Sequence, residues 1–353
     1  MTHQEHHVAT HRPGIPVASR RECLRRLAGV VCATLLWEPL PGWTAPVEPP
    51  SAEILRRHPW LTPWVQQDGM DPQWPQAVLG ELTPDARVIG LMDHQAEARP
   101  YHEYRARVLN DHRIRKGRRM MKKHRAILDK VTSHYPVPPE VVVALWGMES
   151  DFGDGMGQFN VLRTLYTLAA HYPRRADFFR SELHEFLLLC QEERWDPRKP
   201  KGSYAGAMGQ VQMMPGTLRR FAVDFNLDGR RDVVRDVTDS LASIAAFLHG
   251  NDWRPGQRMA QPLEPQAGLA ERFATWAKTR KSWREWRALG ISWPAGSPEP
   301  DLDEPLELII LEESQGPRYY MTFMNFWVII QWNRSSRFAM TVREFALALR
   351  NLE

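Results

Sequence analysis

The stretch that decides the fold is residues 138–153, PPEVVVALWGMESDFG. Two prolines and Glu140 predict a helix start here, because proline suits the first helical turn and an acidic side chain there interacts favourably with the helix dipole. An apolar run then extends from Val141 to Met148 and is interrupted only by Gly147. Because a helix that is apolar on all sides is a buried helix, we predict a buried helix over this stretch.

A single carboxylate, Glu149, stands at the far end of the predicted helix. It follows Trp146 by three residues and Leu145 by four, so that it lies over apolar neighbours on one helix face. A carboxyl group in such surroundings has a raised pKa and can hold a proton near neutral pH, as a general acid must. The alternative interpretation is that Glu149 is simply the first solvent-facing residue where the helix emerges. The stretch alone leaves both interpretations open.

The composition is that of an ordinary globular protein. The chain has 353 residues, of which 43% are hydrophobic and 25% charged, enough for one large domain or two to three small ones. A net charge of +4 and a pI near 9.0 suit an anionic partner without choosing between cell-wall polymer, nucleic acid and membrane. The cysteines are Cys23, Cys32 and Cys190, and the single one outside the N-terminal leader excludes an internal disulfide or a cysteine-based zinc site.

Residues 1–50 are predicted to be an export signal followed by a proline-rich linker. Arg20 and Arg21 precede an apolar run from Leu27 to Trp37, which is too short to span a bilayer. The arginine pair before a leucine resembles a twin-arginine signal. We therefore expect a periplasmic protein whose only membrane association, through an uncleaved leader, would involve this N-terminal segment.

A basic stretch, residues 113–125, contains eight lysines and arginines. It is either the solvated face of a helix or a contact for an anionic polymer. Nothing nearby resembles a nucleic-acid-binding module, and stacking aromatic side chains are not interleaved with the charges. Nucleic acid is therefore not expected as a partner.

A second unusual stretch, GSYAGAMGQVQMMP, occupies residues 202–215. Its glycines permit tight turns and close approach to the backbone, and Ser203, Gln210 and Gln212 suit a surface on which a polar ligand lies. The phosphate-loop pattern GxxxxGK[ST] and the serine-hydrolase pattern GxSxG are both absent. A helix is predicted to start at Pro215 and to continue through Phe221.

The segment 224–229, DFNLDG, matches the first half of a calcium-binding loop. Oxygen ligands stand at positions 1, 3 and 5 and a glycine at position 6, but Arg235 replaces the usual glutamate at position 12. Asp239 lies beyond and opens a predicted helix over residues 240–249. A plain turn rich in aspartate and asparagine is the alternative interpretation.

The remaining pattern predicts mainly helices and a small β-containing segment. We expect a helical region and core over residues 51–253, an inserted α/β subdomain over 254–320, and a C-terminal segment over 321–353 that packs back on the core. The predicted helices cover residues 161–170, 174–190 and 269–289, and the predicted strands cover residues 306–311 and 319–323. Residues 326–332 and 341–349 are apolar enough to pack back on the core. Arg174 and Arg175 open one of these helices and are candidates for facing a cleft.

Five segments in this order and spacing closely resemble the membrane-bound lytic murein transglycosylase B family, from about residue 54 to the end. They are WGMESDFG (146–153), YPRRADFF (172–179), GSYAGAMGQVQMMP (202–215), DFNLDGRRD (224–232) and NFWVIIQWNRSSRFAM (325–340). The resemblance implies a mainly α, α+β fold with a lysozyme-like helical core, an appended helical region and a small β-containing insertion. It also implies non-hydrolytic cleavage of the β-1,4 bond between N-acetylmuramic acid and N-acetylglucosamine, which leaves 1,6-anhydromuramic acid ends.

The resemblance also implies roles for particular residues. Glu149 matches the catalytic acid and base, and the matches to residues of the glycan cleft are Tyr104, Arg174, Arg175, Ser203, Gln212 and Asn333. The matches to the calcium loop are Asp224, Asn226, Asp228 and Asp239, with the carbonyl of Arg230 as a further ligand, although the loop toward Asp239 is longer than in some members. This sequence also departs from the family at four positions where some members have tyrosine. These are Phe178, Phe247, Trp332 and Phe338.

A mechanism with one carboxylate is expected. Asp151 follows Glu149 by two residues and points to a different side of the helix, so that no acid and nucleophile pair is offered. No cofactor is expected for catalysis, and Ca²⁺ would be structural. The expected partners are peptidoglycan glycan strands and cell-wall synthases. A hydrolytic muramidase and a non-catalytic peptidoglycan-binding scaffold are the alternatives.

Overall fold

The computed structural model describes residues 50–67, 70, 73–93, 99–266, 268–276 and 279–350. The described residues belong to one compact unit, Glu48–Glu353. The predicted export signal, with Cys23 and Cys32, lies outside them. Among the described helices, none is both long and apolar enough to cross a lipid bilayer.

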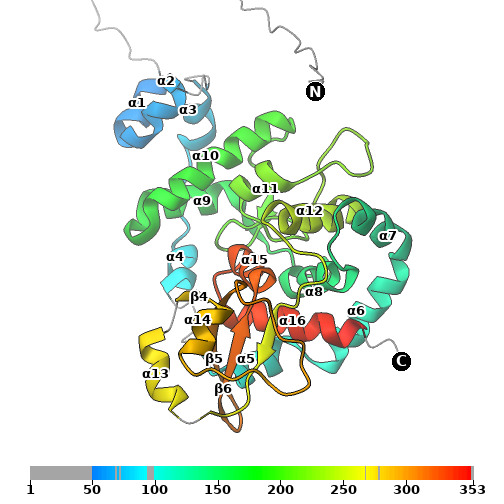
Figure 1. Cartoon of the computed structure of the whole chain (residues 1–353). Helices are drawn as coiled ribbons and strands as arrows, with labels where there is room; N and C mark the ends of the chain where they lie inside the picture. The colour runs from blue at the N-terminus through cyan, green and yellow to red at the C-terminus, as the bar shows by residue number, and fades with distance from the viewer. Residues whose placement is uncertain are drawn as a thin grey trace, which may run out of the picture. The chain divides into compact units, whose positions relative to one another are not determined.

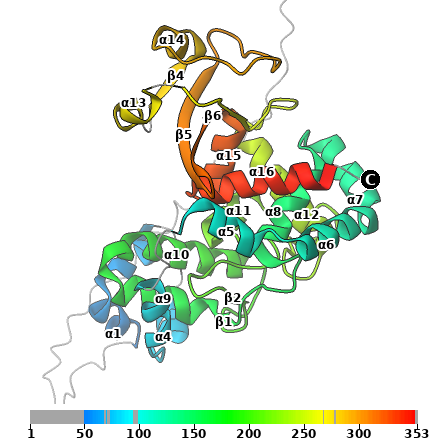
Figure 2. The same ribbon diagram turned by 90° about the horizontal axis from the view of Figure 1, so that it is seen from below.

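Helix α8 (Pro139–Ser150) lies in the core, as predicted. Its side chains from Val141 to Gly147 are all buried. Neighbouring helices α6 (Asp111–Lys123), α12 (Val237–Gly250) and α16 (Ser336–Arg350) contact it, and Figure 2 shows α16 running alongside α8. The helix ends where Asp151 adopts a left-handed backbone conformation with a φ of 49°.

Most of the other described elements are helices, and those that the sequence predicted at 161–170 and 215–221 are confirmed (Figure 1). Helix α9 contacts α10, and α10 contacts α11. The bounds are α1 (Pro50–Arg57), α2 (Thr62–Gln67), α3 (Gln73–Leu79), α4 (Ala86–Asp93), α5 (Tyr101–Val108), α7 (Arg125–His134), α9 (Val161–His171), α10 (Ala176–Glu192), α11 (Pro215–Phe221) and α15 (Met324–Trp332), with 3-10 turns η1 (Pro59–Leu61) and η2 (Pro173–Arg175).

The strands form two antiparallel sheets in the described chain. Strand β1 (Phe159–Asn160) pairs with β2 (Lys201–Gly202). The larger sheet has the order β3-β6-β5-β4, from β3 (Ala260–Pro262), β4 (Arg280–Ser282), β5 (Pro305–Glu313) and β6 (Gly316–Thr322). Strands β5 and β6 confirm the two predicted strands, and they pair with Ile309 opposite Tyr320.

Strand β5 is buried on both faces, and its side chains pack in two different hydrophobic clusters. Leu306 and Leu308 pack in a small cluster with Trp283 and Trp286, whereas Ile309 and Leu311 pack in the main core. Successive side chains of a strand point to opposite faces, so that this strand joins both clusters. The predicted division into domains at residues 253 and 320 stays a prediction.

The prediction of one helix over residues 269–289 is wrong. The segment forms α13 (Leu269–Trp276), then β4, which pairs with β5, and then α14 (Trp283–Ala288). Ser282 starts α14 with a capping box, because its hydroxyl accepts from the Glu285 N–H at 3.3 Å and Glu285 accepts from the Ser282 N–H at 2.8 Å. The Ser-x-x-Glu pattern is a signal that the sequence already carried.

Gly147 lets α8 approach two aromatic rings closely. A Cβ added there would lie 2.6 Å from the Phe152 ring and 2.8 Å from the Phe345 ring. We expect Gly147→Ala to lower the free energy of unfolding by roughly 1–3 kcal/mol, although alanine favours helix, because the rings must move.

Urea denaturation measures this effect, with Gly90→Ala in α4 as the matched control. A Cβ at Gly90 meets nothing within 4 Å, so that the control should raise stability by up to about 1 kcal/mol. Equal stabilisation in both variants would contradict the close packing at Gly147.

Candidate functional site

The carboxyl group of Glu149 is half-buried in the last turn of α8 and has one hydrogen-bond partner in the described chain. Its Oε1 accepts from the indole Nε1 of Trp332 at 2.7 Å. Desolvation by burial raises the pKa of Glu149 to about 7, while the Trp332 N–H opposes this because it stabilises the carboxylate. Burial therefore gives Glu149 the raised pKa that its apolar neighbours predicted.

Trp332 is a site residue that the sequence did not assign to Glu149. It ends α15, and 183 residues separate it from Glu149. Its ring packs edge-on against Phe247, with the centroids 4.8 Å apart, which fixes the direction of its N–H. No local pattern could have paired the two residues, since only the packing of α15 near the end of α8 brings them together.

The hydrogen bond from Trp332 also distinguishes the two carboxyl oxygens of Glu149. An indole nitrogen only donates, so that Oε1 of Glu149 remains an acceptor in either protonation state. Because the carbonyl oxygen of a carboxylic acid is a better acceptor than its hydroxyl oxygen, this bond favours the proton on Oε2. The site thus presents the acidic proton on the side away from Trp332.

Tyr104 of α5 lies close enough to Glu149 to feel its charge. Burial raises the pKa of the Tyr104 hydroxyl, the negative charge of Glu149 raises it further, and the positive charges of Arg113 and Arg337 act against them. The structure thus brings together Tyr104 and Glu149, two of the predicted site residues.

The glycine-rich stretch is attached to the end of α8. Buried Gln210 accepts through Oε1 from the Trp146 indole N–H at 3.1 Å, and its backbone carbonyl accepts from the Ser150 hydroxyl at 2.6 Å. These bonds flank Glu149 in sequence. The two unusual stretches of the sequence therefore meet at one place.

Ser203 and Gln212 are bonded within this loop. The Ser203 hydroxyl accepts from the backbone N–H groups of Ala205 and Ala207, at 3.3 and 3.0 Å. The Gln212 amide donates to the carbonyls of Met156 and Gly209, at 3.0 and 2.9 Å. In this structure both side chains stabilise the shape of the loop.

The remaining predicted cleft residues are exposed. Arg174 forms an ion pair with Asp93, and Arg175 lies over the Phe178 ring at 4.4 Å. Both belong to the turn η2, so that the helix predicted to begin with them starts at Ala176 instead. Asn333 directly follows Trp332 at the end of α15. Within the described part of the chain, neither arginine contacts Glu149.

Asp151 is engaged in ion pairs. Its carboxylate contacts Lys116 at 2.7 Å and Arg113 at 3.3 Å. Burial raises the pKa of Asp151, but the hydrogen bond and charge of Lys116 and the charge of Arg113 outweigh it, so that the pKa is lowered. Asp151 therefore stays ionised and caps the helix, as its position two residues after Glu149 suggested.

These contacts divide the basic stretch of α6. Arg113 and Lys116 face inward, and Arg118 donates to the Ala348 carbonyl at 2.8 Å. The exposed members of the stretch 113–125 are Arg115, Arg119, Lys122, Lys123 and Arg125. The stretch is thus a solvated face only in part.

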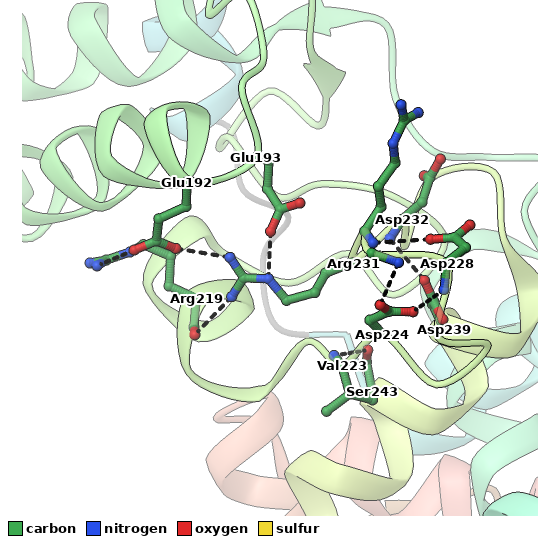
Figure 3. Close-up of polar contacts among 12 residues, drawn as sticks. Glu192, Glu193, Arg219, Val223, Asp224, Asp228, Arg231, Asp232, Asp239 and Ser243 are labelled. Atoms are coloured by element: carbon green, nitrogen blue, oxygen red, sulfur yellow. Dashed lines mark hydrogen bonds and ion pairs between the residues drawn. The ribbon is translucent and has the colours of Figure 1, made fainter.

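The predicted calcium loop is held by its own hydrogen bonds (Figure 3). Asp224 accepts from the N–H groups of Asp228 and Gly229, at 3.0 and 2.8 Å. Asp239 is fully buried, and its two oxygens accept from Phe225 and Asp232, both at 2.9 Å. Burial raises the pKa of Asp239, and these N–H groups act against it.

The loop has the oxygen chemistry that Ca²⁺ prefers. In the residues that the structure describes, no three His, Cys, Asp or Glu side chains lie close enough to hold a metal ion. Asn226 instead donates its amide to Asp228 and Asp236, at 3.3 and 3.0 Å, and Arg230 donates its N–H to Asp228 at 3.0 Å. These hydrogen bonds are those of a turn rich in aspartate and asparagine, and the calcium site stays a prediction.

Arg231 connects this loop to the end of α10 (Figure 3). Its guanidinium contacts Glu193 at 2.5 Å and Glu192 at 2.8 Å. Arg219 of α11 shares Glu192 at 2.7 Å. Charged contacts therefore tie Arg231 to the end of α10, and Arg219 links the same end to α11.

Removing the indole donor should raise the pKa of Glu149. We expect Trp332→Phe to raise the pKa of Glu149 from about 7 by about one further pKa unit. Such a change is equivalent to about 1.4 kcal/mol, the low end for a hydrogen bond to a charged group. An NMR titration of the Glu149 carboxyl carbon measures it, with Trp327→Phe on the same helix as the control. An unchanged pKa in Trp332→Phe would show that the hydrogen bond does not act on the charge.

Comparison with known proteins identifies the family. The model of the transglycosylase SLT domain matches residues 58–347. Membrane-bound lytic murein transglycosylase B of Escherichia coli K12 is 32% identical over 298 residues, which cover 81% of this chain and 80% of that protein.

Solved structures agree with this sequence relationship. The soluble lytic transglycosylase SltB1 of Pseudomonas aeruginosa superposes with a TM-score of 0.75 and 31% identity, over 83% of this chain and 98% of that one. The E. coli lytic transglycosylase Slt35 in complex with calcium superposes with a TM-score of 0.73 and 30% identity, over 83% of this chain and 92% of that one. P. aeruginosa SltB3 in complex with NAG-NAM-pentapeptide superposes with a TM-score of 0.73 and 32% identity, over 84% of this chain and 79% of that one. These matches confirm the predicted mainly helical, lysozyme-like fold, and the chain belongs to the transglycosylase SLT domain family, that of the lytic murein transglycosylases.

Proposed function

We propose that the chain is a peptidoglycan lytic transglycosylase in which Glu149 is the single general acid and base. It cleaves the β-1,4 bond between N-acetylmuramic acid and N-acetylglucosamine and leaves 1,6-anhydromuramic acid ends. The observation that carries the proposal is the burial of the Glu149 carboxyl at the end of α8, which raises its pKa to about 7. A group with that pKa can both donate and accept a proton near neutral pH.

In the first step, protonated Glu149 donates the proton on Oε2 to the glycosidic oxygen as the bond to the anomeric carbon breaks. The N-acetyl group of the muramic acid stabilises the positive charge at that carbon. Oε1 stays bonded to the Trp332 N–H, which stabilises the carboxylate formed by the transfer. The glycosidic oxygen leaves as the hydroxyl group of the departing sugar.

In the second step, the Glu149 carboxylate accepts the proton of the muramic acid 6-hydroxyl. The oxygen of that hydroxyl then bonds to the anomeric carbon and closes the anhydro ring, so that no water is consumed. The apolar surroundings of Glu149 serve both steps, because they hold its pKa near neutrality and exclude competing water.

The surroundings of Asp151 support a mechanism with one carboxylate. Most glycosidases use two carboxyl groups that flank the scissile bond. Asp151 is neighbour to Glu149 in sequence, but Lys116 and Arg113 hold it ionised at the helix end. The N-acetyl group of the substrate takes the place of a second carboxylate.

Mass spectrometry of digested murein separates this function from its alternatives. We expect soluble fragments with anhydromuramic ends. Reducing muramic ends would identify a hydrolytic muramidase. Binding to murein without soluble fragments would identify a non-catalytic scaffold.

Glu149→Gln should lower the rate of murein cleavage by at least about 10²-fold, the usual contribution of a general acid or base. Retained turnover in this variant would end the assignment of Glu149. The fold should stay intact, because the amide keeps the shape of the side chain and can still accept from Trp332.

The pH dependence of stability provides the control for this variant. Folding raises the pKa of Glu149 from 4.5 to about 7, so that its favourable contribution is complete below about pH 4.5 and is lost as pH rises through 7. Glu149→Gln should therefore equal the parent protein in stability at pH 4 and exceed it by on the order of 2–3 kcal/mol above pH 8. Lower stability at both pH values would mean that the variant has lost its fold.

We also propose that the 224–229 loop binds a structural Ca²⁺ after rearranging. Slt35 was solved in complex with calcium, and Asp224 and Asp228 supply suitable oxygens at the loop. Saturating Ca²⁺ should raise the melting temperature of the parent protein, and Asp224→Asn with Asp228→Asn should remove the increase. No increase in saturating Ca²⁺, with Mg²⁺ as the control, would exclude the ion.

The proposed reaction also defines the location and partners. Its substrate is an extracytoplasmic polymer, and we propose the periplasm as the compartment and an export signal in residues 1–50 as the route. Peptidoglycan strands are the proposed binding partners, with cell-wall synthases as further ones.

A further inference from the structure

Arg337 is a half-buried arginine near the candidate site, and its Nε is a buried donor without a hydrogen-bond partner in the described structure. It lies in the first turn of α16, five residues after Trp332. No described carboxylate forms an ion pair with it.

Neighbouring arginines behave differently. Arg105 of α5 contacts Glu344 at 3.2 Å, Arg113 contacts Asp151 at 3.3 Å, and Arg118 donates to the Ala348 carbonyl at 2.8 Å. A buried donor without a partner lowers stability, and so does a cation at the positive end of a helix. Arg337 combines both unfavourable features, which points to a ligand that the free protein lacks.

The position of Arg337 relates it to the proposed chemistry. The hydroxyl of Tyr104 feels both the negative charge of Glu149 and the positive charge of Arg337. Trp332, which bonds Glu149, ends α15, and Arg337 lies five residues later in the first turn of α16. Four side chains from α5, α8, α15 and α16 therefore belong to one site.

Arg337 does not neutralise Glu149. The described structure contains no ion pair between them, and no cation acts on the Glu149 pKa, which stays at about 7. A paired arginine would lower this pKa and keep Glu149 ionised, which would remove its proton. The guanidinium is thus available to another oxygen group close to the reacting carboxyl.

We propose that Arg337 binds the lactyl side chain of the muramic acid whose anomeric carbon reacts. The inference rests on the proposed function. The lactyl group distinguishes muramic acid from N-acetylglucosamine, and it presents a carbonyl oxygen when a peptide stem is attached and a carboxylate when the stem is absent. A guanidinium is a planar donor fork that suits either oxygen group. Arg337 then selects muramic acid for the subsite beside Glu149.

The test compares ligands with and without the lactyl group. Glu149→Gln serves as the non-cleaving parent, and tryptophan fluorescence measures its binding to muramic acid-containing tetrasaccharides, with and without stems, and to chitotetraose. We expect Arg337→Gln to weaken binding of both muramic ligands about tenfold and binding of chitotetraose less than twofold. Arg337→Lys should lie between. Exposed Arg334, three residues earlier, provides the matched control, and Arg334→Gln should change each affinity less than twofold.

Equal losses for muramic ligands and chitotetraose would overturn the proposal, and so would no loss for either. A greater loss with stem-free ligands than with stem-bearing ones would assign the carboxylate as the main acceptor, and equal losses in the two muramic ligands would assign the carbonyl. Because the free protein leaves Arg337 without a partner, the melting temperature of Arg337→Gln should equal or exceed that of the parent. A fall in melting temperature with rescue of both affinities by Arg337→Lys would mark a structural role and overturn the proposal.

Kinetics distinguish this inference from the proposed function. In the cleaving enzyme, Arg337→Gln should raise KM for murein about tenfold with kcat within threefold, since the acid and its proton are untouched. Failure of the proposed function would instead appear in the wild-type protein, which would release no anhydromuramic fragments. Selective binding of muramic ligands would remain measurable in that case.

Discussion

The structure depends on one constraint, which is that an ionisable carboxyl must lie at the end of a helix whose residues from Val141 to Gly147 are all buried. The residues before Glu149 in α8 are packed by α6, α12 and α16, which remove them from water. The same packing desolvates the Glu149 carboxyl and raises its pKa. The helix then stops within two residues, because Asp151 turns left-handed and is held by Lys116. The buried end of α8 and the charged residue that follows it thus lie within one helical turn.

Two carboxylates two residues apart consequently have opposite properties. Asp151 has two cationic neighbours that lower its pKa and fix it as a charge, whereas Glu149 has an indole donor and an apolar environment that leave it able to change charge. Environments that push two pKa values apart assign different tasks to chemically similar groups. Asp151 maintains the helix end from which Glu149 acts. The basic stretch of α6 contributes to this arrangement through Arg113 and Lys116, and so is more than a solvated face.

The sequence predicted those features that local periodicity and composition determine. Helix α8, the raised pKa of Glu149, helix α11 and strands β5 and β6 follow from apolar spacing and flanking residues. The prediction of one helix over residues 269–289 was wrong because it gave the apolar spacing more weight than the capping box at Ser282, which the sequence also shows. The bond from Trp332 to Glu149 had no sequence signal, since it joins residues that only tertiary packing brings together. The roles of Ser203 and Gln212 inside the loop could not be predicted from the sequence either, because the same hydroxyl and amide can bind a ligand or the backbone.

The positions where some family members have tyrosine show how polarity is redistributed in this chain. Phe247 and Phe338 are buried and offer only apolar surface, and Trp332 offers a donor that cannot accept. Arg337 is a charged donor of this region, and its buried Nε has no hydrogen-bond partner at a helix start where a positive charge is unfavourable. Local rules of stability are most often broken at functional sites, so that the cost at Arg337 is itself an argument that substrate binding relieves it.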